Sequence, residues 1–385
     1  MMRLKELVLQ ACPDYRDLLA IPDRWIKGVQ CDSRKVEKDF LFVAIRGKEK
    51  NGNEFVEEAL SRGAVAVVTD QEGAGAQRDT PFILVPECRL AMANLAAVFY
   101  GRPSLAMKVI GITGTNGKTT TAYLIEHLVR MENKKVGVIG TVNYRFDGHE
   151  IPAAETTPGP LKIQELLAQM RDAGCEYAVM EISSHALDQH RVTGVDFAAA
   201  LFTNLTQDHL DYHKTLEAYF ECKSRLFSGL GVDNISVLNA DDPWTERLKK
   251  KTRSRIVTFG IETPSDFRAT EIEKRQEATH FMLETNEEKF SVRSPLIGLH
   301  NVYNALGALA TLSCLGFDLK KSVSSLSSFP GVPGRLEAVS AGQNFLVFVD
   351  FAHTPDGLEN VLSSLRPYKK NRLITVFGCG GDRDK

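Results

Sequence analysis

Residues 108–121, KVIGITGTNGKTTT, constrain the fold of this 385-residue chain more than any other stretch. The β-branched run from Val109 to Ile112 predicts a short buried strand. Glycines and small polar residues follow, and the segment from Thr119 to Val129 has apolar side chains at helical spacing. Strand, loop and helix in this order place backbone N–H groups and a helix N-terminus around one point, which attracts phosphate.

The loop also carries two side chains suited to a nucleotide. Lys118 can reach the β- and γ-phosphates, and the Thr119 hydroxyl is placed to ligate Mg²⁺. The motif is not literal, because Ile112 stands where the usual pattern has a glycine, five residues before Gly117. The alternative is an ordinary glycine-rich turn between a strand and a helix. We predict nucleotide binding, because Gly-Lys-Thr after a strand is a specific signal.

Composition limits the class of protein. An apolar content of 43% and a charged content of 25% are typical of soluble globular proteins. The net charge of -2 gives no electrostatic reason to expect nucleic acid or an anionic membrane as a partner. The charged, amphipathic N-terminus lacks a signal-peptide core, and no apolar run is long enough for membrane insertion. Seven scattered cysteines without a CxxC pair favour a reducing, cytoplasmic environment over zinc or disulfides.

The length predicts two or three domains. Residues 1–103 resemble a small N-terminal α/β domain, and 104–331 a central domain with a mostly parallel sheet. Residues 332–385 follow a Pro-Gly-rich linker and begin a Rossmann-like domain. Because so short a segment falls below an average domain of roughly 100–150 residues, we expect the chain to stop inside this third domain.

The expected elements follow from periodicity. In the first domain we predict a strand at 40–45, a helix at 53–62 and a strand at 64–68. In the central domain strands and helices alternate, which argues for a parallel sheet covered by helices: 109–113, 119–131, 136–141, 161–173, 177–182, 198–203, 216–228 and 235–239. A long helix is predicted at 298–315. Beyond the linker we predict strands at 345–349 and 373–377 around a helix at 357–365.

In such sheets ligands lie at the carboxyl ends of the strands. Glu181 ends one apolar strand, and an acidic residue there commonly holds Mg²⁺; a helix-capping carboxylate is the alternative. After the next strand, the polar run 204–213 contains His209 among several ligand-type side chains. A single histidine is more often structural, but the density of this run favours a site.

Lys223 lies on the apolar side of its predicted helix, together with Leu216, Phe220 and Phe227. The commoner outcome for such a lysine is a side chain that extends to water. The alternative is a buried, neutral amine, because desolvation lowers a lysine pKa. A neutral amine can take up CO₂ to form an anionic carbamate. Sequence alone favours the solvated lysine.

Several motifs together give the chain a resemblance to the Mur ligase family. They are GTNGKTTT, Thr156-Thr157-Pro158, EISSHALDQHRV, TNLTQDHLDYH, CKSRLF, HNVYNAL, GVPGRLE, VDFAHTPDGL and FGCGGDRDK. The resemblance runs from Asp32 to Lys385, and the EISSHALDQHRV and FGCGGDRDK segments are its most specific parts. They are similar to the members that add the third amino acid to the peptidoglycan precursor peptide.

The resemblance implies residue roles. ATP would be bound by Gly114, Thr115, Asn116, Gly117, Lys118, Thr119 and Thr120, and its adenosine or phosphates contacted by Asn301, Arg335 and Asp350. One Mg²⁺ would be held by Thr119 and Glu181, and a second by His209 and carbamylated Lys223. Lys118, Lys223 and His209 would be catalytic.

The resemblance also implies substrate contacts. Ser33 would meet the uridine diphosphate end of the substrate, although Asp32-Ser33-Arg34 taken alone is more often a turn or a helix cap. The sugar-peptide portion would be met by Thr156, Thr157, Ser183, Gln189 and Arg191, and the incoming amino acid by Arg383. Two positions depart from the family pattern: Glu155 stands where asparagine is frequent, and Phe351 where tyrosine is usual.

The implied reaction is ATP-dependent amide formation on UDP-N-acetylmuramoyl-L-alanyl-D-glutamate through an acyl phosphate. We expect a monomer. Its diamino acid is expected to be meso-2,6-diaminopimelate, the commoner substrate of similar family members. L-Lysine is the alternative, because the motif that separates the two lies beyond residue 385. A folylpolyglutamate synthetase-like ligase is a rival, against which the Asp-Ser-Arg domain argues. A non-catalytic ATP-binding module is another.

Overall fold

The computed structural model describes residues 1–13, 15, 21–47, 50–73, 80–275, 278–353, 355–369 and 371–378. Contacts between residues divide the chain into two compact units. The first consists of 1–107, 158–173 and 185–196, and the second of 108–157, 174–184 and 197–385. The three domains predicted from the sequence are continuous ranges, whereas these units are made of separate segments. The three-domain boundaries therefore stay a prediction.

The first unit contains a four-stranded parallel sheet with the order β3-β4-β5-β6 among the described residues. Its strands are β3 (Gly28–Gln30), β4 (Phe40–Val43), β5 (Ala64–Thr69) and β6 (Phe82–Leu84). A small antiparallel pair, β1 (Met2–Arg3) and β2 (Trp25–Ile26), lies beside α1 (Leu4–Ala11). The other helical segments are η2 (Ser33–Lys35), η3 (Gly52–Phe55), α2 (Val56–Ser61), α3 (Cys88–Phe99), η4 (Pro103–Ala106) and α5 (Pro160–Asp172).

Alternation and helical spacing explain how this unit closes its core. The apolar side chains of α1 recur at helical spacing, so that Leu4, Leu7 and Val8 are buried against α3. The predicted strand at 64–68 is confirmed as β5, whose apolar side chains serve both faces of the sheet. The predicted helix at 53–62 divides into η3 and α2.

The second unit is built on a sheet that, within the described residues, has eleven strands in the order β10-β9-β8-β11-β7-β12-β13-β14-β15-β16-β17. These are β7 (Lys108–Thr113), β8 (Val136–Ile139), β9 (Asn143–Phe146), β10 (His149–Pro152), β11 (Tyr177–Glu181), β12 (Phe197–Phe202), β13 (Ile235–Asn239), β14 (Arg255–Gly260), β15 (Phe267–Lys274), β16 (Thr279–Thr285) and β17 (Lys289–Ser294). The strands from β8 to β15 pair in parallel, and both ends of the sheet continue antiparallel.

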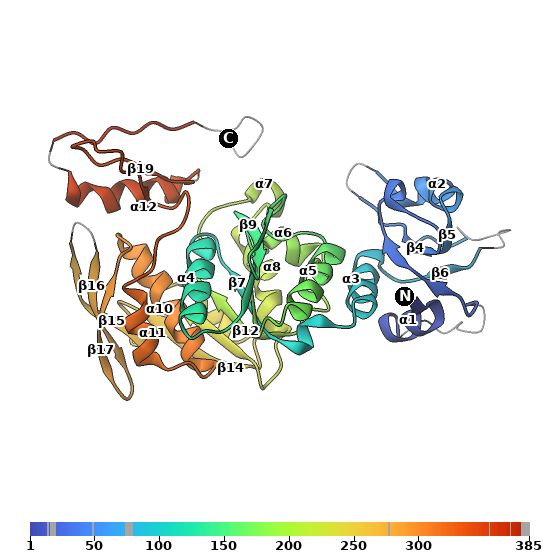
Figure 1. Cartoon of the computed structure of the whole chain (residues 1–385), viewed down its shortest axis with the longest axis horizontal. Coiled ribbons are helices and arrows are strands. Elements are labelled where there is room, and N and C mark those ends of the chain that lie inside the picture. The colour runs from blue at the N-terminus through green and yellow to red at the C-terminus, as the bar shows by residue number, and fades with distance from the viewer. Residues whose placement is uncertain are drawn as a thin grey trace. The chain divides into compact units, whose positions relative to one another are not determined.

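Helices cover both faces of this sheet. α4 (Lys118–Met131) and α10 (Leu299–Cys314) lie side by side on one face, with α11 (Leu319–Leu326) beside them (Figure 1). α8 (Leu216–Ser228) packs on the other face, where Phe227 meets Phe202 of β12. The unit also contains the short helices α7 (Leu210–His213) and α9 (Thr245–Lys249), whereas α6 (Ser184–Asp188) belongs to the first unit from residue 185 on.

The order of the strands brings the sequence motifs together. β7 lies between β11 and β12 and pairs in parallel with both, so Thr113, Glu181 and Phe202 end at one edge. The loops that follow these three strands therefore share that edge, as expected for a parallel sheet. The predicted mostly parallel α/β fold is confirmed.

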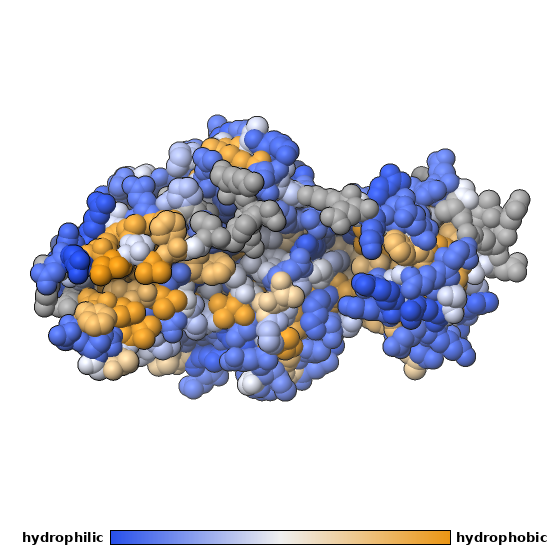
Figure 2. Space-filling view, turned by 90° about the horizontal axis from the view of Figure 1, so that it is seen from above, coloured by the Kyte–Doolittle hydropathy of each residue, from blue (hydrophilic) through white to orange (hydrophobic). Residues whose placement is uncertain are grey.

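Beyond residue 331 the structure is sparser. β18 (Glu337–Ala338) pairs with β19 (Phe348–Val349), and α12 (Pro355–Leu365) leads into η5 (Arg366–Tyr368). The predicted helix is present, and the first predicted strand is reduced to its last two residues. The predicted strand at 373–377 is wrong: its residues pair with no strand among the described residues, and Val376 is 94% exposed. Apolar side chains without a neighbouring ladder do not make a strand. Figure 2 shows that the face of the molecule seen from above carries several exposed apolar patches.

Candidate functional site

The loop between β7 and α4 needs its glycines. Gly114 has a φ of 147°, and a Cβ there would collide with Oγ1 of Thr203. Gly117 has a φ of 88°, and a Cβ there would collide with Oδ1 of Asn304 on α10. Both positions combine a left-handed backbone with close approach of a neighbour, which only glycine tolerates. The glycine pattern of the sequence thus reflects the packing of the loop.

The polar segment after β12 binds this loop. Asn204 accepts from the backbone N–H of Thr115 through its carbonyl, at 2.8 Å, and from the N–H of Asn116 through its side chain, at 2.9 Å. Thr203 donates its hydroxyl to the carbonyl of Asn116 at 2.6 Å. These bonds occupy two of the N–H groups expected to face phosphate. The first turn of α4, beginning at Lys118, retains N–H groups that no helical carbonyl can reach.

Two lysines converge on one carbonyl. Lys118 donates to the Gly114 oxygen at 2.9 Å and to the Thr115 oxygen at 2.8 Å. Lys223, more than 100 residues away in the chain, donates to the same Gly114 oxygen at 2.9 Å. The helix α8 thereby delivers an amine directly to the phosphate loop. Burial lowers the pKa of Lys118, while the nearby Glu181 and Asp208 raise it.

Lys223 is buried, so the expectation that its amine extends to water is wrong. Its side chain is 2% exposed, and its ammonium lies 4.5 Å from the centre of the Tyr219 ring. Its helix face packs inward with Phe220 and Phe227, which leaves no route to solvent along the helix. Burial, followed by the neighbouring charge of Lys118, lowers the pKa of Lys223 well below its ordinary value. The geometry is that of the second alternative, a desolvated amine.

Glu181 is 1% exposed, and both oxygens of its carboxylate accept hydrogen bonds. Thr119 donates its hydroxyl to Oε2 at 2.8 Å. Thr141 donates its backbone N–H to Oε1 and its hydroxyl to Oε2, both at 2.9 Å. The capping alternative does not describe this residue, because Glu181 binds the phosphate-loop threonine. A carboxylate and a hydroxyl side by side form an oxygen donor set suited to Mg²⁺.

His209 lies in the turn before α7 with a left-handed backbone, φ 54°. Asp208 accepts its backbone N–H at 2.8 Å, and their side chains approach to 3.5 Å. Burial lowers the pKa of His209, and Asp208 opposes this shift. Among the described residues, no group of three or more His, Cys, Asp or Glu side chains is arranged to hold a metal ion. Further oxygen ligands would have to come from nucleotide, water or a modified side chain.

Three predicted substrate residues gather beside Glu181. Thr157 is buried, donates to the carbonyl of Glu181 at 2.7 Å, and accepts the N–H of Ser183 at 3.0 Å. Thr156 lies 3.1 Å from Thr141, hydroxyl to hydroxyl. Glu155, one of the two residues that depart from the family pattern, is exposed, and its carbonyl accepts the Tyr144 hydroxyl at 2.7 Å.

The remaining nucleotide candidates lie on α10 and in the C-terminal part. Asn301 is buried, donates to the carbonyl of Ile297 and accepts from Asn304. Arg335 reaches the Thr119 hydroxyl at 3.4 Å, and its guanidinium lies over the ring of Phe351. Asp350 accepts two backbone N–H groups, those of residues 336 and 352.

Three other predicted substrate residues, Ser33, Gln189 and Arg191, belong to the first unit. Ser33 is buried and donates to Glu58 at 2.6 Å, while Asp32 caps the η2 helix. The cap expected for Asp32 is therefore present. Arg191 donates twice to the side-chain oxygen of Gln189, at 3.2 and 3.0 Å. Arg383 lies outside the described residues.

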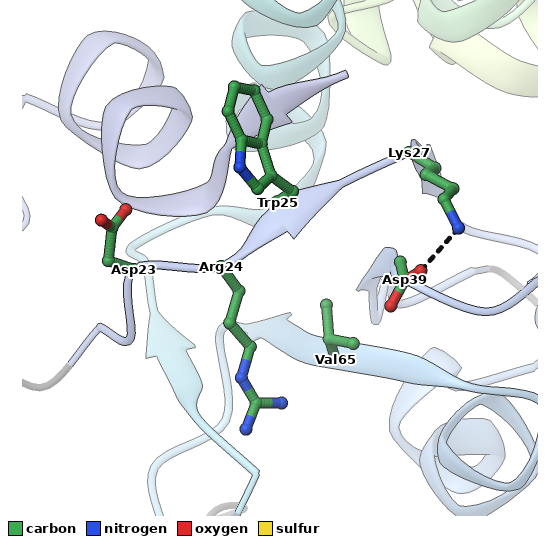
Figure 3. Close-up of a pocket in the computed structure, with 6 residues that line it drawn as sticks. All are labelled: Asp23, Arg24, Trp25, Lys27, Asp39 and Val65. Carbon is green, nitrogen blue, oxygen red and sulfur yellow. Dashed lines mark hydrogen bonds and ion pairs between the residues drawn. The ribbon is translucent and has the colours of Figure 1, made fainter.

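A pocket in the first unit is separate from these motifs. It is lined by Asp23, Arg24, Trp25, Lys27, Asp39 and Val65. Figure 3 shows the side chains of Arg24 and Trp25 pointing to opposite sides of the backbone. It also shows Lys27 paired with Asp39, at 2.7 Å. Because these groups do not converge on one point, we assign no ligand to the pocket.

Sequence reasoning missed three residues that shape the site: Thr141, Thr203 and Asn304. Thr141 and Thr203 each come just after a parallel strand, so the rule about strand ends could have identified them. Asn304 follows Asn301 by three residues on one helix, which places both on the same face. The sequence did not indicate that Asn304 accepts the Thr121 hydroxyl, at 3.3 Å.

Fold and site together define a nucleotide-binding α/β protein of the phosphate-loop type, with a buried lysine at the loop. Family descriptions agree: "Mur ligase middle domain" matches residues 112–312, "Mur ligase family, catalytic domain" matches 25–100, and "Mur ligase, glutamate ligase domain" matches 334–385. The chain belongs to the Mur ligase family.

Individual relatives are similar over most of the chain. The UDP-N-acetylmuramoyl-L-alanyl-D-glutamate--2,6-diaminopimelate ligase of Geobacillus thermodenitrificans is 44% identical over 366 residues, covering 94% of this chain and 74% of that protein. A solved structure of a ligase with the same name superposes with a TM-score of 0.82 at 32% identity, covering 100% of this chain and 78% of that one. A MurF structure from Acinetobacter baumannii shares the fold, with a TM-score of 0.69 at 24% identity and coverages of 94% and 76%.

Proposed function

We propose that the chain is an ATP-dependent ligase that joins 2,6-diaminopimelate to UDP-N-acetylmuramoyl-L-alanyl-D-glutamate in peptidoglycan precursor synthesis. The observation that carries the proposal is the meeting of Lys118 and Lys223 at the Gly114 carbonyl. A structural lysine in α8 has no reason to lie there, whereas a phosphoryl-transfer site needs cationic or metal-binding groups around the phosphate loop. Names of relatives at 42–45% identity support the choice of reaction.

The proposed reaction has two steps, phosphorylation of a carboxylate and attack of an amine on the acyl phosphate. An oxygen of the D-glutamate γ-carboxylate attacks the γ-phosphorus of ATP, the bond to the β-phosphate oxygen breaks, and ADP leaves. The acyl phosphate is then attacked by the amine of diaminopimelate, which loses a proton as the amide forms and phosphate departs. ATP is required because a carboxylate does not condense with an amine in water.

Residues of the chain stabilise the charge that moves. Lys118 would leave the Gly114 and Thr115 carbonyls to bind the β- and γ-phosphates, where its ammonium offsets negative charge on the transferring group. The N-terminal turn of α4 directs its N–H groups to the same phosphates. Arg335, in reach of Thr119, adds a second cation, and Asn301 and Asp350 would complete the nucleotide site.

The donor atoms fit magnesium. Thr119 and Glu181 would hold one Mg²⁺ through their oxygens, and His209 with carbamylated Lys223 would hold a second. When bound, these ions would neutralise phosphate charge and draw the reacting groups together. Carbamylation is supported by the burial of Lys223 and its depressed pKa, since a neutral amine attacks CO₂ and loses a proton to leave an anionic carbamate.

Each unit carries proposed substrate residues. In the second unit, Thr156, Thr157 and Ser183 would meet the sugar-peptide portion beside Glu181, and in the first unit Gln189 and Arg191 would offer amide and guanidinium donors to it. Ser33 would meet the uridine diphosphate end. Because Ser33 donates to Glu58 in this structure, substrate contact would require its hydroxyl to accept or rotate. Arg383 would bind the incoming amino acid.

Location and assembly are part of the proposal. Free cysteines among the described residues, such as Cys31 and Cys88, fit a reducing cytoplasm, where ATP and nucleotide-linked substrates occur. No described helix has the length and hydrophobicity that crossing a bilayer requires. We propose a monomer, which size-exclusion chromatography with light scattering would test.

The experiment is a phosphate-release assay with mass detection of the amide. With ATP, Mg²⁺ and UDP-N-acetylmuramoyl-L-alanyl-D-glutamate, we expect phosphate and one amide per ATP when meso-diaminopimelate is added. L-Lysine in its place tests the second diamino acid, and folate with glutamate tests the folylpolyglutamate synthetase rival. Turnover with folate alone contradicts the proposal, as does ATP binding without product under every condition, which describes a non-catalytic module.

A further inference from the structure

Thr141 contacts both a proposed magnesium ligand, Glu181, and a proposed substrate residue, Thr156. It lies just after β8, and two of its donors bind the Glu181 carboxylate, the backbone N–H at Oε1 and the hydroxyl at Oε2. A Cβ on Gly140 would collide with Oε1 of Glu181, so a larger residue there would displace the carboxylate. The carboxylate therefore lies directly against the backbone of residues 140–141, and its orientation is fixed from this side.

The Thr141 hydroxyl has a second partner on the 153–157 loop. Its oxygen lies 3.1 Å from that of Thr156. A hydroxyl has one hydrogen, and Thr141 gives its own to Glu181, so Thr156 must be the donor in this pair. Thr119 donates to the same Glu181 oxygen. A continuous chain of hydrogen bonds thus runs from Thr156 through Thr141 and Glu181 to the phosphate loop.

Other hydrogen bonds also hold the 153–157 loop. Tyr144 holds the carbonyl of Glu155 at 2.7 Å, and Thr157 donates to the Glu181 carbonyl at 2.7 Å. Thr157 also accepts the N–H of Ser183. The bond between Thr141 and Thr156 adds a link from this loop to the residue that holds the Glu181 carboxylate.

We propose that Thr141 is a positioning residue that fixes the muramoyl-peptide loop, residues 153–157, in register with Glu181 and the phosphate loop. This inference rests on the proposed function. It adds a residue that holds the D-glutamate γ-carboxylate of the substrate in place relative to the γ-phosphate of ATP. The chemistry needs such a coupling, because the attacking oxygen must lie in line with the γ-phosphorus, and small misplacements cost large factors in rate.

The test compares Thr141→Val, which removes the hydroxyl but keeps shape and backbone N–H, with Thr141→Ser, which keeps the hydroxyl. We expect Thr141→Val to lower kcat/KM for the UDP-muramoyl dipeptide by roughly 10- to 100-fold, and Thr141→Ser to restore most of it. Thr285→Val, which removes an exposed hairpin hydroxyl, is the matched control and should have no effect. Wild-type kcat/KM in Thr141→Val contradicts the inference.

A double-mutant cycle separates coupling from independent contributions. Thr141→Val and Thr156→Val both remove the bond between the two hydroxyls, so the double variant should lose less than the product of the two single losses. Effects that multiply would show that the two hydroxyls act separately, and would overturn the inference.

A second readout needs no turnover and no metal. Hydrogen exchange of amides 153–157 in the unliganded protein should rise about tenfold in Thr141→Val and stay near wild type in Thr141→Ser, with melting temperatures within about 3 °C. A general rise across the chain, or a large fall in melting temperature, would make Thr141 merely structural. If wild-type protein forms no amide, the proposed function fails, and the exchange result still decides the role of Thr141.

Discussion

The interior position of Lys223 costs free energy, because its amine leaves water for one carbonyl and the face of Tyr219. Replacing it with methionine, of similar length and without charge, removes that cost. We therefore expect Lys223→Met to melt at or above the wild-type temperature while ligase activity falls by at least about 100-fold. Differential scanning fluorimetry and the phosphate-release assay would measure the two effects.

The control for this variant is Lys250→Met, because Lys250 is exposed. It should leave activity and melting temperature near wild type. A Lys223→Met protein that is unstable but fully active would identify Lys223 as structural and remove the main support for the proposed function.

Asp241 provides a pH-dependent contribution to stability. Burial raises its pKa, but three backbone N–H groups, from residues 261, 262 and 263, outweigh this and lower it to about 2. Tyr303 also donates to it at 2.8 Å. Because the folded-state pKa lies below the unfolded value, its contribution is complete above about pH 4 and is lost as pH falls toward 2.

We expect Asp241→Asn to lower the free energy of unfolding at pH 7 by about 1–2 kcal/mol, a figure reduced for its partial exposure. The difference from wild type should shrink as the pH falls from 4 to 3. Urea unfolding at pH 7, 5 and 3 would measure it, with the exposed Asp233→Asn as control. A difference that is constant with pH would mean that the lost contacts are not electrostatic.

For single residues, the sequence predicted which side chains belong to the site better than it predicted their burial and their hydrogen-bond partners. The spacing of α8 placed Lys223 on the apolar face, but helical periodicity does not say whether a long side chain bends out to water. That outcome depends on the Gly114 carbonyl, which the fold brings close from a distant part of the chain. Glu181 was likewise identified as a candidate ligand. Its hydrogen bond with Thr141 could not be predicted, because it depends on the pairing of β8 with β11.

Among the elements, the phosphate loop is sensitive to a single methyl group. Gly114→Ala would combine a strained φ with a collision against Thr203, so the loop must shift. We expect a loss of about 2–4 kcal/mol in stability and a weakening of ATP-analogue binding by at least about tenfold. Gly148→Ala is the control, because it has a φ of 80° in the β9–β10 turn but open space around it.

Gly148→Ala should cost only backbone strain, about 1 kcal/mol, and leave nucleotide affinity unchanged. Chemical denaturation and calorimetric titration with a non-hydrolysable ATP analogue would compare the two variants. Equal effects would show that strain, and not the packing of the loop against Thr203, makes Gly114 necessary.

Strand and helix positions in the central unit were predictable because local pattern and tertiary context agree there. The run 109–113 is apolar and β-branched, and it occupies the centre of a parallel sheet as β7. The run 373–377 has the same local pattern but no neighbouring strand among the described residues, so no ladder forms. Propensity therefore gave the same prediction for both, and pairing decided the outcome.

For the whole molecule, contacts divide the chain in a way that sequence punctuation did not indicate. The turn-forming segment Gly101-Arg102-Pro103-Ser104 lies where the first domain was predicted to end, at residue 103. In the structure, residues 158–173 and 185–196 group with the first hundred residues. Leu161 packs against the apolar core of that unit, and Arg171 donates to the carbonyl of Tyr100. Turn-forming residues mark changes of direction, whereas the limits of a core depend on segments far away in the chain.

This division predicts that residues 1–103 are not self-sufficient. The helix α3 packs against α5, and a Cβ on Gly194 would lie 2.9 Å from the Cβ of Ala97, so α3 is tightly covered by later segments. Without them, α3 would expose its apolar face to water at about 25 cal/mol per Å².

We expect a protein made of residues 1–103 to unfold at lower urea concentration than the same region within the full chain, as followed by native-state hydrogen exchange of β4 and β5 amides. In the full chain, Leu161→Ala should weaken protection of α1 and α3 amides by about 1–2 kcal/mol while β16 amides stay unchanged, because Leu161 contacts only the first unit's core cluster among those described. Equal stability of the short protein and the full chain would instead support an independent domain ending near residue 103.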